Sequence, residues 1–230
     1  MTSPARRPEP DPADEPPARG GERTYVGHMT REAFRRYDEH AEYRHEYVDG
    51  AVYAMSTGTR GHSRIAGNVY FRLHALTLGT GCQAHTQGFT VLTPRNNEYV
   101  PDVVVECGAP GAPNDALYVE TPCLVVEVLS PGTARTDLTE KVQAYGEIPT
   151  VRAYLVVDAA WRRVRRYWRE DAGAWQVDEV VGACAVPLPC PAGGVLTLDE
   201  VYADLALPST PPPPPRPALR RVREAPFAPA

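Results

Sequence analysis

Two short apolar runs place the strongest constraint on how this chain can fold. They span residues 100–105 and 123–129, and both are rich in valine, with little alternation of polar and apolar positions. Runs of this kind are typical of strands that are buried on both faces of a sheet. A predicted helix at about residues 136–147 follows the second run, and another apolar run at 153–157 comes next. Strand, helix and strand in this order form a crossover unit, so we predict an α/β fold with a mixed central sheet flanked by helices.

The segment before these runs is predicted to begin with a helix and a β-hairpin. Thr30 is a suitable N-cap for the helix. An Asp-Gly pair at 49–50 lies between two strand-like runs and indicates a tight hairpin turn, because both turn positions need positive φ angles. A second helix is expected over about 63–78, where apolar residues recur at helical spacing. The runs 82–86 and 89–92 are expected to be paired strands.

Proline marks both ends of the chain. Residues 1–24 and 208–230 together hold 15 of the 25 prolines, and we predict that both segments are disordered tails. The remaining segment, 25–207, is long enough for one domain with a well-buried core and too short for two. No stretch has the apolar character of a signal sequence or a membrane-spanning helix. We therefore expect a cytoplasmic protein that does not enter a membrane.

Cysteine spacing favours neither a metal centre nor a disulfide scaffold. The five cysteines stand at positions 82, 107, 123, 184 and 190, and no two of them form a CxxC pair. An odd number in a chain of this size does not indicate a disulfide framework. His85 lies close to Cys82 in the sequence, but no third ligand follows at a suitable spacing.

The basic residues are almost uniform, because 23 of the 24 are arginine and only Lys141 is lysine. Lysine carries a compact ammonium whose pKa responds to burial and to neighbouring charges. Codon usage is one interpretation of this exception. The other is that chemistry requires an ammonium here, and two acids on apolar segments upstream, Asp102 and Glu127, favour it. Asp, Glu and Lys in this order indicate metal-assisted cleavage of phosphodiester bonds.

The two acids could bind one metal ion if their strands are neighbours. By alternation, Glu127 shares a strand face with Val125 and Leu129. An ionised carboxylate in that setting is costly unless it is paired or bound to a metal. Two carboxylates that point at one spot could hold Mg²⁺ together with the backbone carbonyl of Val128. Lys141 would then position or deprotonate a water and offset charge in the transition state.

Each of these residues also has a structural interpretation. Glu127 could be a strand-end acid that reaches solvent or pairs with an arginine, and Asp102 could cap a loop. Lys141 could form an ordinary i,i+4 ion pair with Asp137 on a solvated helix face, although arginine would serve there equally well.

An ordered series of motifs extends beyond these residues. The motifs are Tyr47-Val-Asp-Gly50, His62-Ser-Arg-Ile-Ala-Gly67, Pro101-Asp102 followed by three valines, Glu127-Val-Leu-Ser-Pro-Gly-Thr133, the set Asp137, Lys141 and Tyr145, and Tyr154-Leu-Val-Val-Asp158. Over roughly residues 29–205 this series resembles the Uma-type family of putative restriction endonucleases, which belongs to the PD-(D/E)XK nuclease superfamily.

The resemblance implies a restriction-endonuclease-like fold and gives roles to individual residues. Asp102 and Glu127 match the metal-binding acids of the superfamily. Its lysine usually stands two residues after the glutamate, a position that holds Leu129 here. Lys141 resembles the relocated lysine that this family carries on the next helix.

Two further sets of residues are candidates for supporting roles. Glu46 and His62 fall on motif positions of the family, so they could approach the metal or its water, or be structural. Residues 161–169 contain five arginines interleaved with aromatic side chains, a pattern that fits phosphate contacts. The interpretation that we favour is a solvated edge strand protected by its charges. The arginines that could contact phosphates are Arg162, Arg163, Arg165 and Arg166.

Together these patterns predict a Mg²⁺- or Mn²⁺-dependent endonuclease that hydrolyses DNA, with a homodimer as an option. The net charge of −5 disfavours non-specific wrapping of nucleic acid but allows a nuclease whose carboxylates are screened by a cation. Two alternatives stay open. One is a catalytically decayed nuclease fold that binds nucleic acid or protein, and the other is a metal-dependent hydrolase of a different phosphoester.

Overall fold

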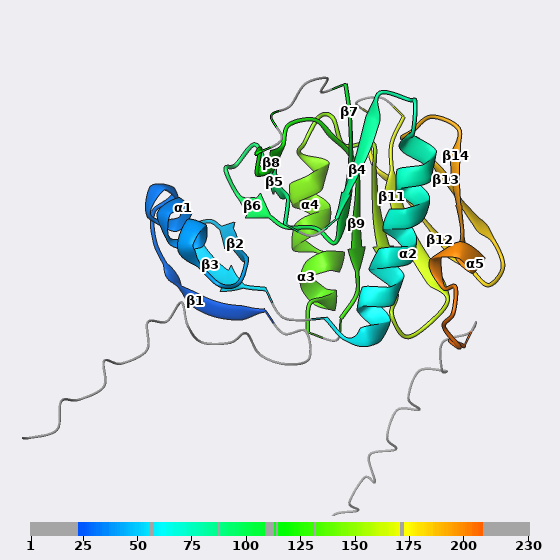
Figure 1. Ribbon diagram of the computed structural model, residues 1–230, viewed down its shortest axis with the longest axis horizontal. Coiled ribbons are helices and arrows are strands. Elements are labelled where there is room, and N and C mark those ends of the chain that lie inside the picture. Colours follow the sequence, from blue (N-terminus) through cyan, green and yellow to red (C-terminus); the bar gives the residue numbers. More distant parts are fainter. Residues whose placement is uncertain are drawn as a thin grey trace, which may run out of the picture.

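The computed structural model describes residues 23–55, 58–86, 88–108, 113, 115–130, 132–170 and 173–208. Within them the chain forms two six-stranded mixed sheets and a two-stranded hairpin, with helices packed around them (Figure 1). The N-terminal sheet contains β1 (Thr24–His28), β2 (His45–Val48), β3 (Ala51–Ala54), β5 (Thr90–Leu92), β6 (Glu98–Tyr99) and β8 (Tyr118–Val119). The central sheet contains β4 (Cys82–Thr86), β7 (Val103–Cys107), β9 (Pro122–Val128), β10 (Ala153–Val157), β11 (Arg163–Trp168) and β12 (Gln176–Val181). The hairpin is β13 (Ala185–Leu188) with β14 (Gly194–Thr197), and the helices are α1 (Arg31–His40), α2 (Arg60–Thr77), α3 (Ala134–Leu138), α4 (Glu140–Gly146) and α5 (Leu198–Val201).

The central sheet has the predicted mixed character. Its strand order is β12-β11-β10-β9-β7-β4. Strands β9 and β10 run parallel and are connected through α3 and α4, which confirms the crossover unit. Strand β7 pairs antiparallel with β9, so the segments that carry Asp102 and Glu127 are neighbours. Apart from Cys123, the residues of β9 are buried, as expected for a strand that is covered on both faces.

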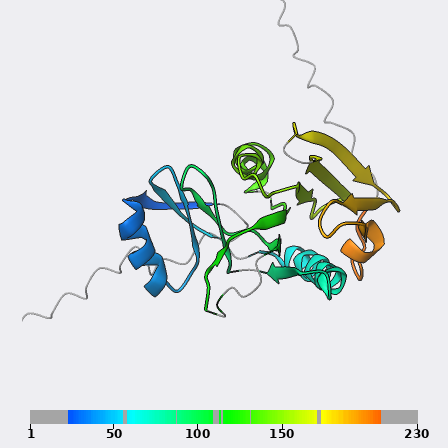
Figure 2. The ribbon, with the colours of Figure 1, turned by 90° about the horizontal axis from the view of Figure 1, so that it is seen from above.

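The central sheet is covered by helices on both faces. Figure 2 shows α2, in cyan, on one side and α3 and α4, in green, on the other. Ile65, Val69 and Leu73 of α2 belong to a first apolar core that β13, β14 and α5 extend. Tyr145 of α4 and Tyr154 of β10 belong to a second core, which also includes residues of the N-terminal sheet. The second core therefore joins the two sheets, with α4 packed against both.

The helix and the β-hairpin predicted for the N-terminal segment are both present. The side chain of Thr30 accepts a hydrogen bond from the N–H of Ala33, which confirms the N-cap of α1. Asp49 and Gly50 have φ angles of 49° and 91°, so the turn between β2 and β3 has the positive values that the Asp-Gly pair predicted. Strand β2 also pairs with β6 and carries Glu46 with its side chain buried.

Two predictions about local structure are wrong. The strands at 82–86 and 89–92 do not pair with each other, because β4 pairs with β7 whereas β5 pairs with β6 and β8. The helix predicted over 136–147 is broken at Thr139, whose φ is −131°. The Thr139 hydroxyl donates to the carbonyl of Arg135, and its N–H turns to the carbonyl of Thr136. The side chain thus takes the carbonyl that a continuous helix would use for its own hydrogen bond.

The boundaries of the fold differ slightly from those predicted. Arg23 forms ion pairs and Thr24 begins β1, although both were assigned to the tail at 1–24. Helix α2 begins at Arg60 because the side chain of Thr59 accepts a hydrogen bond from the N–H of His62. The remainder of the predicted tails, 1–22 and 209–230, lies outside the described residues. Within the described part of the chain, no helix is long and apolar enough to cross a membrane.

Four of the cysteines form disulfides, so the expectation drawn from their odd number is wrong. Cys82 is bonded to Cys107 and Cys123 to Cys190, while Cys184 is free and exposed. The register of β4 and β7 places Cys82 directly opposite Cys107. Sequence spacing could not reveal this, because it depends on which strands pair.

Arg169 stabilises the end of α4. Its guanidinium donates to the carbonyls of Val151, at 2.9 Å, of Gly146, at 3.1 Å, and of Ile148. We expect Arg169→Met to lower the free energy of unfolding by about 2–4 kcal/mol, because these carbonyls lose their shared donor. Arg165→Met is the matched control, because Arg165 forms a more exposed ion pair with Glu179, and it should cost about 0–1 kcal/mol. Urea unfolding of both variants checks this, and equal losses would contradict it.

Candidate metal and catalytic site

A polar cavity of about 90 Å³ lies where β7 begins and β9 ends. The first turn of α2 borders it on one side, and α3 and α4 border it on the other. The charged and titratable side chains that line it are Arg23, Glu46, His62, Asp102, Glu127, Asp137 and Lys141. The structure thus brings together the three predicted catalytic residues, the two predicted accessory residues and Val128.

Asp102 is held at the edge of the cavity by two contacts. Its Oδ2 accepts a hydrogen bond from the N–H of Val128 at 2.8 Å, which ties the start of β7 to the end of β9. The same oxygen lies 3.2 Å from Nε2 of His62. Burial alone would lower the pKa of His62. The pKa is raised instead, because His62 has a hydrogen bond to Asp102, lies beside its negative charge, and has a hydrogen bond to the backbone of Val128. His62 therefore favours its protonated form beside this carboxylate.

Glu127 is enclosed as deeply as its apolar sequence context predicted. Its Oε1 lies 2.8 Å from Nζ of Lys141 and accepts a hydrogen bond from the hydroxyl of Tyr145 at 3.1 Å. Burial raises the pKa of Glu127 well above its ordinary value, although the positive charge of Lys141 opposes the shift. The alternative of a strand-end acid that reaches solvent is wrong, because only 5% of this residue is exposed.

Lys141 is surrounded by carboxylates. Its Nζ lies 2.8 Å from Glu127, 2.9 Å from Glu46 and 3.4 Å from Asp137. Burial would lower the pKa of Lys141, but the carboxylates outweigh it and hold the pKa well above its ordinary value. The i,i+4 contact with Asp137 that the structural interpretation predicted is present. It does not lie on a solvated helix face, because Lys141 is only 4% exposed.

Two further residues of the cavity were not identified from the sequence. Asp137 was considered only as an ion-pair partner, yet its carboxylate is buried and lines the cavity. Arg23 was assigned to a disordered tail, but its Nε lies 3.3 Å from Glu46 and its Nη1 lies 3.0 Å from Glu140. The Asp137-Lys141 spacing within the motif series could have identified the first residue. No sequence signal indicated the second, which depends on the path of the chain before β1.

Several buried polar atoms of the cavity lack a hydrogen-bond partner among the described residues. Nδ1 of His62 is one of them, while Oδ1 of Asp137 and Nε of Arg23 have only their ion-pair contacts with Lys141 and Glu46. Among the described residues, four carboxylates line the cavity against three basic side chains, those of Lys141, Arg23 and His62. Oxygen-rich donors with an excess of negative charge fit a hard divalent cation such as Mg²⁺ or Mn²⁺.

Leu129 explains why the usual lysine position is not used. It lies on the same strand run as Glu127 and packs against the second core. A lysine at this position would have to place its stem among apolar side chains. Lys141 reaches the same cavity from α4, across the face of the sheet on which Glu127 lies.

The arginine-rich strand β11 is engaged elsewhere. It lies between β10 and β12, so it is not the edge strand that we expected. All four arginines predicted as phosphate contacts have acidic partners, which are Asp199 for Arg162, Asp158 for Arg163, Glu179 for Arg165 and Asp178 for Arg166. These pairs favour the structural interpretation of the run.

The fold and the acidic cleft define an α/β protein of the restriction-endonuclease-like class. The sequence profile of the Uma2 family, described as "Putative restriction endonuclease", matches residues 31–207. The chain therefore belongs to the Uma2 family, and the resemblance seen in its motifs is confirmed.

The chain is also similar to two relatives and to a solved structure. "Uncharacterized protein slr1290" of Synechocystis sp. is 30% identical over 183 residues, which cover 77% of this chain and 93% of that protein. "Uncharacterized protein sll1609" of the same organism is 26% identical over 157 residues, which cover 67% and 88%. The crystal structure of "a putative nuclease belonging to DUF820" from Anabaena variabilis matches with a TM-score of 0.58 at 18% identity, covering 70% of this chain and 91% of that one. This likeness establishes the fold and confirms the predicted fold class.

The carboxylates around Lys141 generate a prediction about stability. Lys141→Met should lower the free energy of unfolding by about 3–5 kcal/mol, because the carboxylates that share its charge would stay buried without it. The control is Arg95→Met, which removes an exposed ion pair with Glu147 and should cost about 0–1 kcal/mol. Urea unfolding at neutral pH without divalent cations measures both values. A Lys141→Met variant as stable as the control would show that the ion network contributes little.

Proposed function

We propose that this protein is a divalent-metal-dependent endonuclease that hydrolyses phosphodiester bonds of DNA. The observation that carries the proposal is the convergence of Asp102, Glu127 and the chain's only lysine on one buried cavity. Membership of a family of nuclease type supports hydrolysis of nucleic acid. The excess of carboxylates supports a requirement for a cation, because an acidic cleft repels phosphate until its charge is screened.

Asp102, Glu127 and the carbonyl of Val128 are the residues that would hold the metal. Asp102 and Glu127 line the same cavity from neighbouring strands, and Val128 is bound to Asp102 through its own N–H. Asp137 offers a further buried carboxylate oxygen, which has an ion-pair contact of 3.4 Å with Lys141. When bound, Mg²⁺ or Mn²⁺ supplies Lewis-acid polarisation of a phosphate oxygen and lowers the pKa of a water.

The residues of the chain would orient the reactants around this centre. The raised pKa of Lys141 keeps it an ammonium at neutral pH, so it acts as a fixed positive charge and hydrogen-bond donor rather than as a base. From there it can hold an attacking water and offset the charge that develops on the phosphate. His62 holds Asp102 in place on the opposite side of the cavity. Arg60 on α2 and Arg135 on α3 are exposed, and each stands two residues from a residue that lines the cavity, so both are candidates for contact with DNA phosphates.

A second candidate function is a nuclease fold that binds its partner without cleaving it. The observation that favours it is the close contact of Lys141 with three carboxylates, which already offsets much of their charge without a metal. Binding of nucleic acid without cleavage in the presence of Mg²⁺ or Mn²⁺ would support this alternative.

Cleavage should depend on the two acids and on a divalent cation. We expect purified protein to nick supercoiled plasmid with Mg²⁺ or Mn²⁺ and not with a chelator. Asp102→Asn and Glu127→Gln should each lower the rate by about 100- to 1000-fold, because loss of metal binding costs several kcal/mol in the transition state. Glu106→Gln is the matched control, because Glu106 is an equally buried acid that pairs with His85. Activity that is unchanged in either acid variant would refute the assignment.

Lys141→Arg separates a catalytic ammonium from a structural positive charge. Arginine keeps the charge, but its planar guanidinium is larger and cannot contact the carboxylates as a single point. We expect folding with a loss of about 1–2 kcal/mol and cleavage that is slower by about 100-fold or more. Thermal melting and plasmid nicking of this variant measure the two effects. Full activity would mean that the choice of lysine is incidental.

A further inference from the structure

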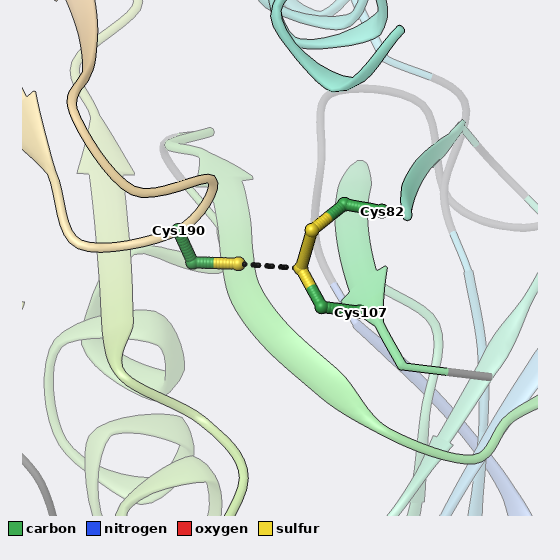
Figure 3. A group of neighbouring side chains, drawn as sticks. All are labelled: Cys82, Cys107 and Cys190. Atoms are coloured by element: carbon green, nitrogen blue, oxygen red, sulfur yellow. Dashed lines mark hydrogen bonds between the residues drawn. A yellow bond between two sulfur atoms is a disulfide. The ribbon is translucent and has the colours of Figure 1, made fainter. Parts of the chain in front are cut away.

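Four of the five cysteines meet at the end of the central sheet that lies opposite the acidic cavity. Cys82 begins β4 and Cys107 ends β7, and these two residues face each other across the strand pair. Cys123 lies near the start of β9, and Cys190 follows β13. Figure 3 shows the side chains of Cys82, Cys107 and Cys190 pointing toward one another from separate segments. The cysteines and the acidic residues thus occupy opposite ends of β7 and β9.

The two disulfides lie in contact with each other, so their sulfur atoms form one cluster. Sγ of Cys107 is 3.1 Å from Sγ of Cys190, although the two residues belong to different disulfides. The sulfurs of Cys82, Cys107 and Cys190 all lie within 4.8 Å of one another. Sγ of Cys123 is bonded directly to that of Cys190. Zinc binds thiolates tetrahedrally at about 2.3 Å, which sets neighbouring sulfurs about 3.8 Å apart. Three of the sulfurs already lie together. Cys123, the bonded partner of Cys190, would supply the fourth ligand once reduction lets the sulfurs of each pair move apart.

The surroundings also favour a ligand site over a purely structural staple. A domain with two apolar cores does not depend on disulfides for folding, unlike a small secreted scaffold. Cys190 is buried and the other three cysteines are half-buried, so the cluster is protected and still reachable. The remaining cysteine, Cys184, is exposed and free, and it provides an internal comparison.

We propose that the reduced protein binds a zinc ion through the thiolates of Cys82, Cys107, Cys123 and Cys190, and that the two disulfides are the oxidised form of this site. Reducing both disulfides takes four electrons and four protons. Two molecules of a phosphine reductant supply the electrons and become phosphine oxide with oxygen from two waters, whose hydrogens protonate the four thiols. Zinc binding then releases the thiol protons to solvent. The ion ties the β13–β14 segment to the ends of β4, β7 and β9, and it is independent of the acidic cavity.

The test measures zinc retained by the full chain after anaerobic reduction with a phosphine, incubation with zinc and dialysis. We expect about one zinc ion per chain. Cys107→Ser and Cys190→Ser each remove a direct zinc ligand. Each should weaken zinc binding by more than about 100-fold, because losing a residue that only supports a ligand already weakens binding by about 10- to 100-fold. Cys184→Ser should bind as the natural chain does. The double variant Asp102→Asn, Glu127→Gln should also retain zinc, which separates this site from the proposed nuclease centre.

A second measurement on the natural chain does not depend on the folding of variants. Zinc should protect Cys82, Cys107, Cys123 and Cys190 from alkylation in the reduced protein, while Cys184 is labelled at the same rate with or without zinc. Mass spectrometry of the labelled peptides reads this pattern. Reduced protein that retains no zinc, serine variants that bind it undiminished, or alkylation that zinc does not slow would each overturn the proposal.

Discussion

The buried ammonium of Lys141 is the contact on which the arrangement of this molecule depends. It lies within 3.4 Å of carboxylates from three elements, namely Glu46 on β2, Glu127 on β9 and Asp137 on α3. Carboxylates that are buried together repel one another after losing their hydration. The ammonium of Lys141 offsets this repulsion. It also joins the N-terminal sheet, the central sheet and the crossover helices at one place. The cavity is therefore also the junction of the fold.

The pairing of β7 with β9 sets what each end of the central sheet can do. At one end, the bond from the Val128 N–H to Asp102 aligns the acids that line the cavity. At the other end, the same strand pair brings Cys107 and Cys123 toward the segment that carries Cys190. Oxygen and sulfur ligands select different metals, since carboxylates suit Mg²⁺ or Mn²⁺ and thiolates suit zinc. The two proposed sites on this strand pair would therefore not compete for the same ion.

The sequence predicted the features that arise from local patterns. Continuous apolar runs predicted β7, β9 and the parallel pairing with β10, and alternation placed Glu127 on the face that α4 covers. The features that it missed depend on contacts between distant segments. The break at Thr139 comes from a side chain taking a backbone carbonyl, and the Cys82–Cys107 pair comes from strand register. Arg23, just before β1, reaches the cavity and pairs with Glu46. The proline-rich N-terminal sequence contains no signal for this contact.

The displaced lysine shows what this type of site requires of a chain. The position two residues after Glu127 is occupied by Leu129, which packs against the second core, and the ammonium comes from α4 instead. The end of the strand and the helix both border the same cavity. The site therefore requires an ammonium at this place in the fold and not at a fixed spacing in the sequence. An ammonium has three donors on one small atom and can contact carboxylates on several sides, whereas a guanidinium presents its donors in a fixed plane. In a cavity of about 90 Å³ bordered by acids on three elements, that difference favours lysine over arginine at this position.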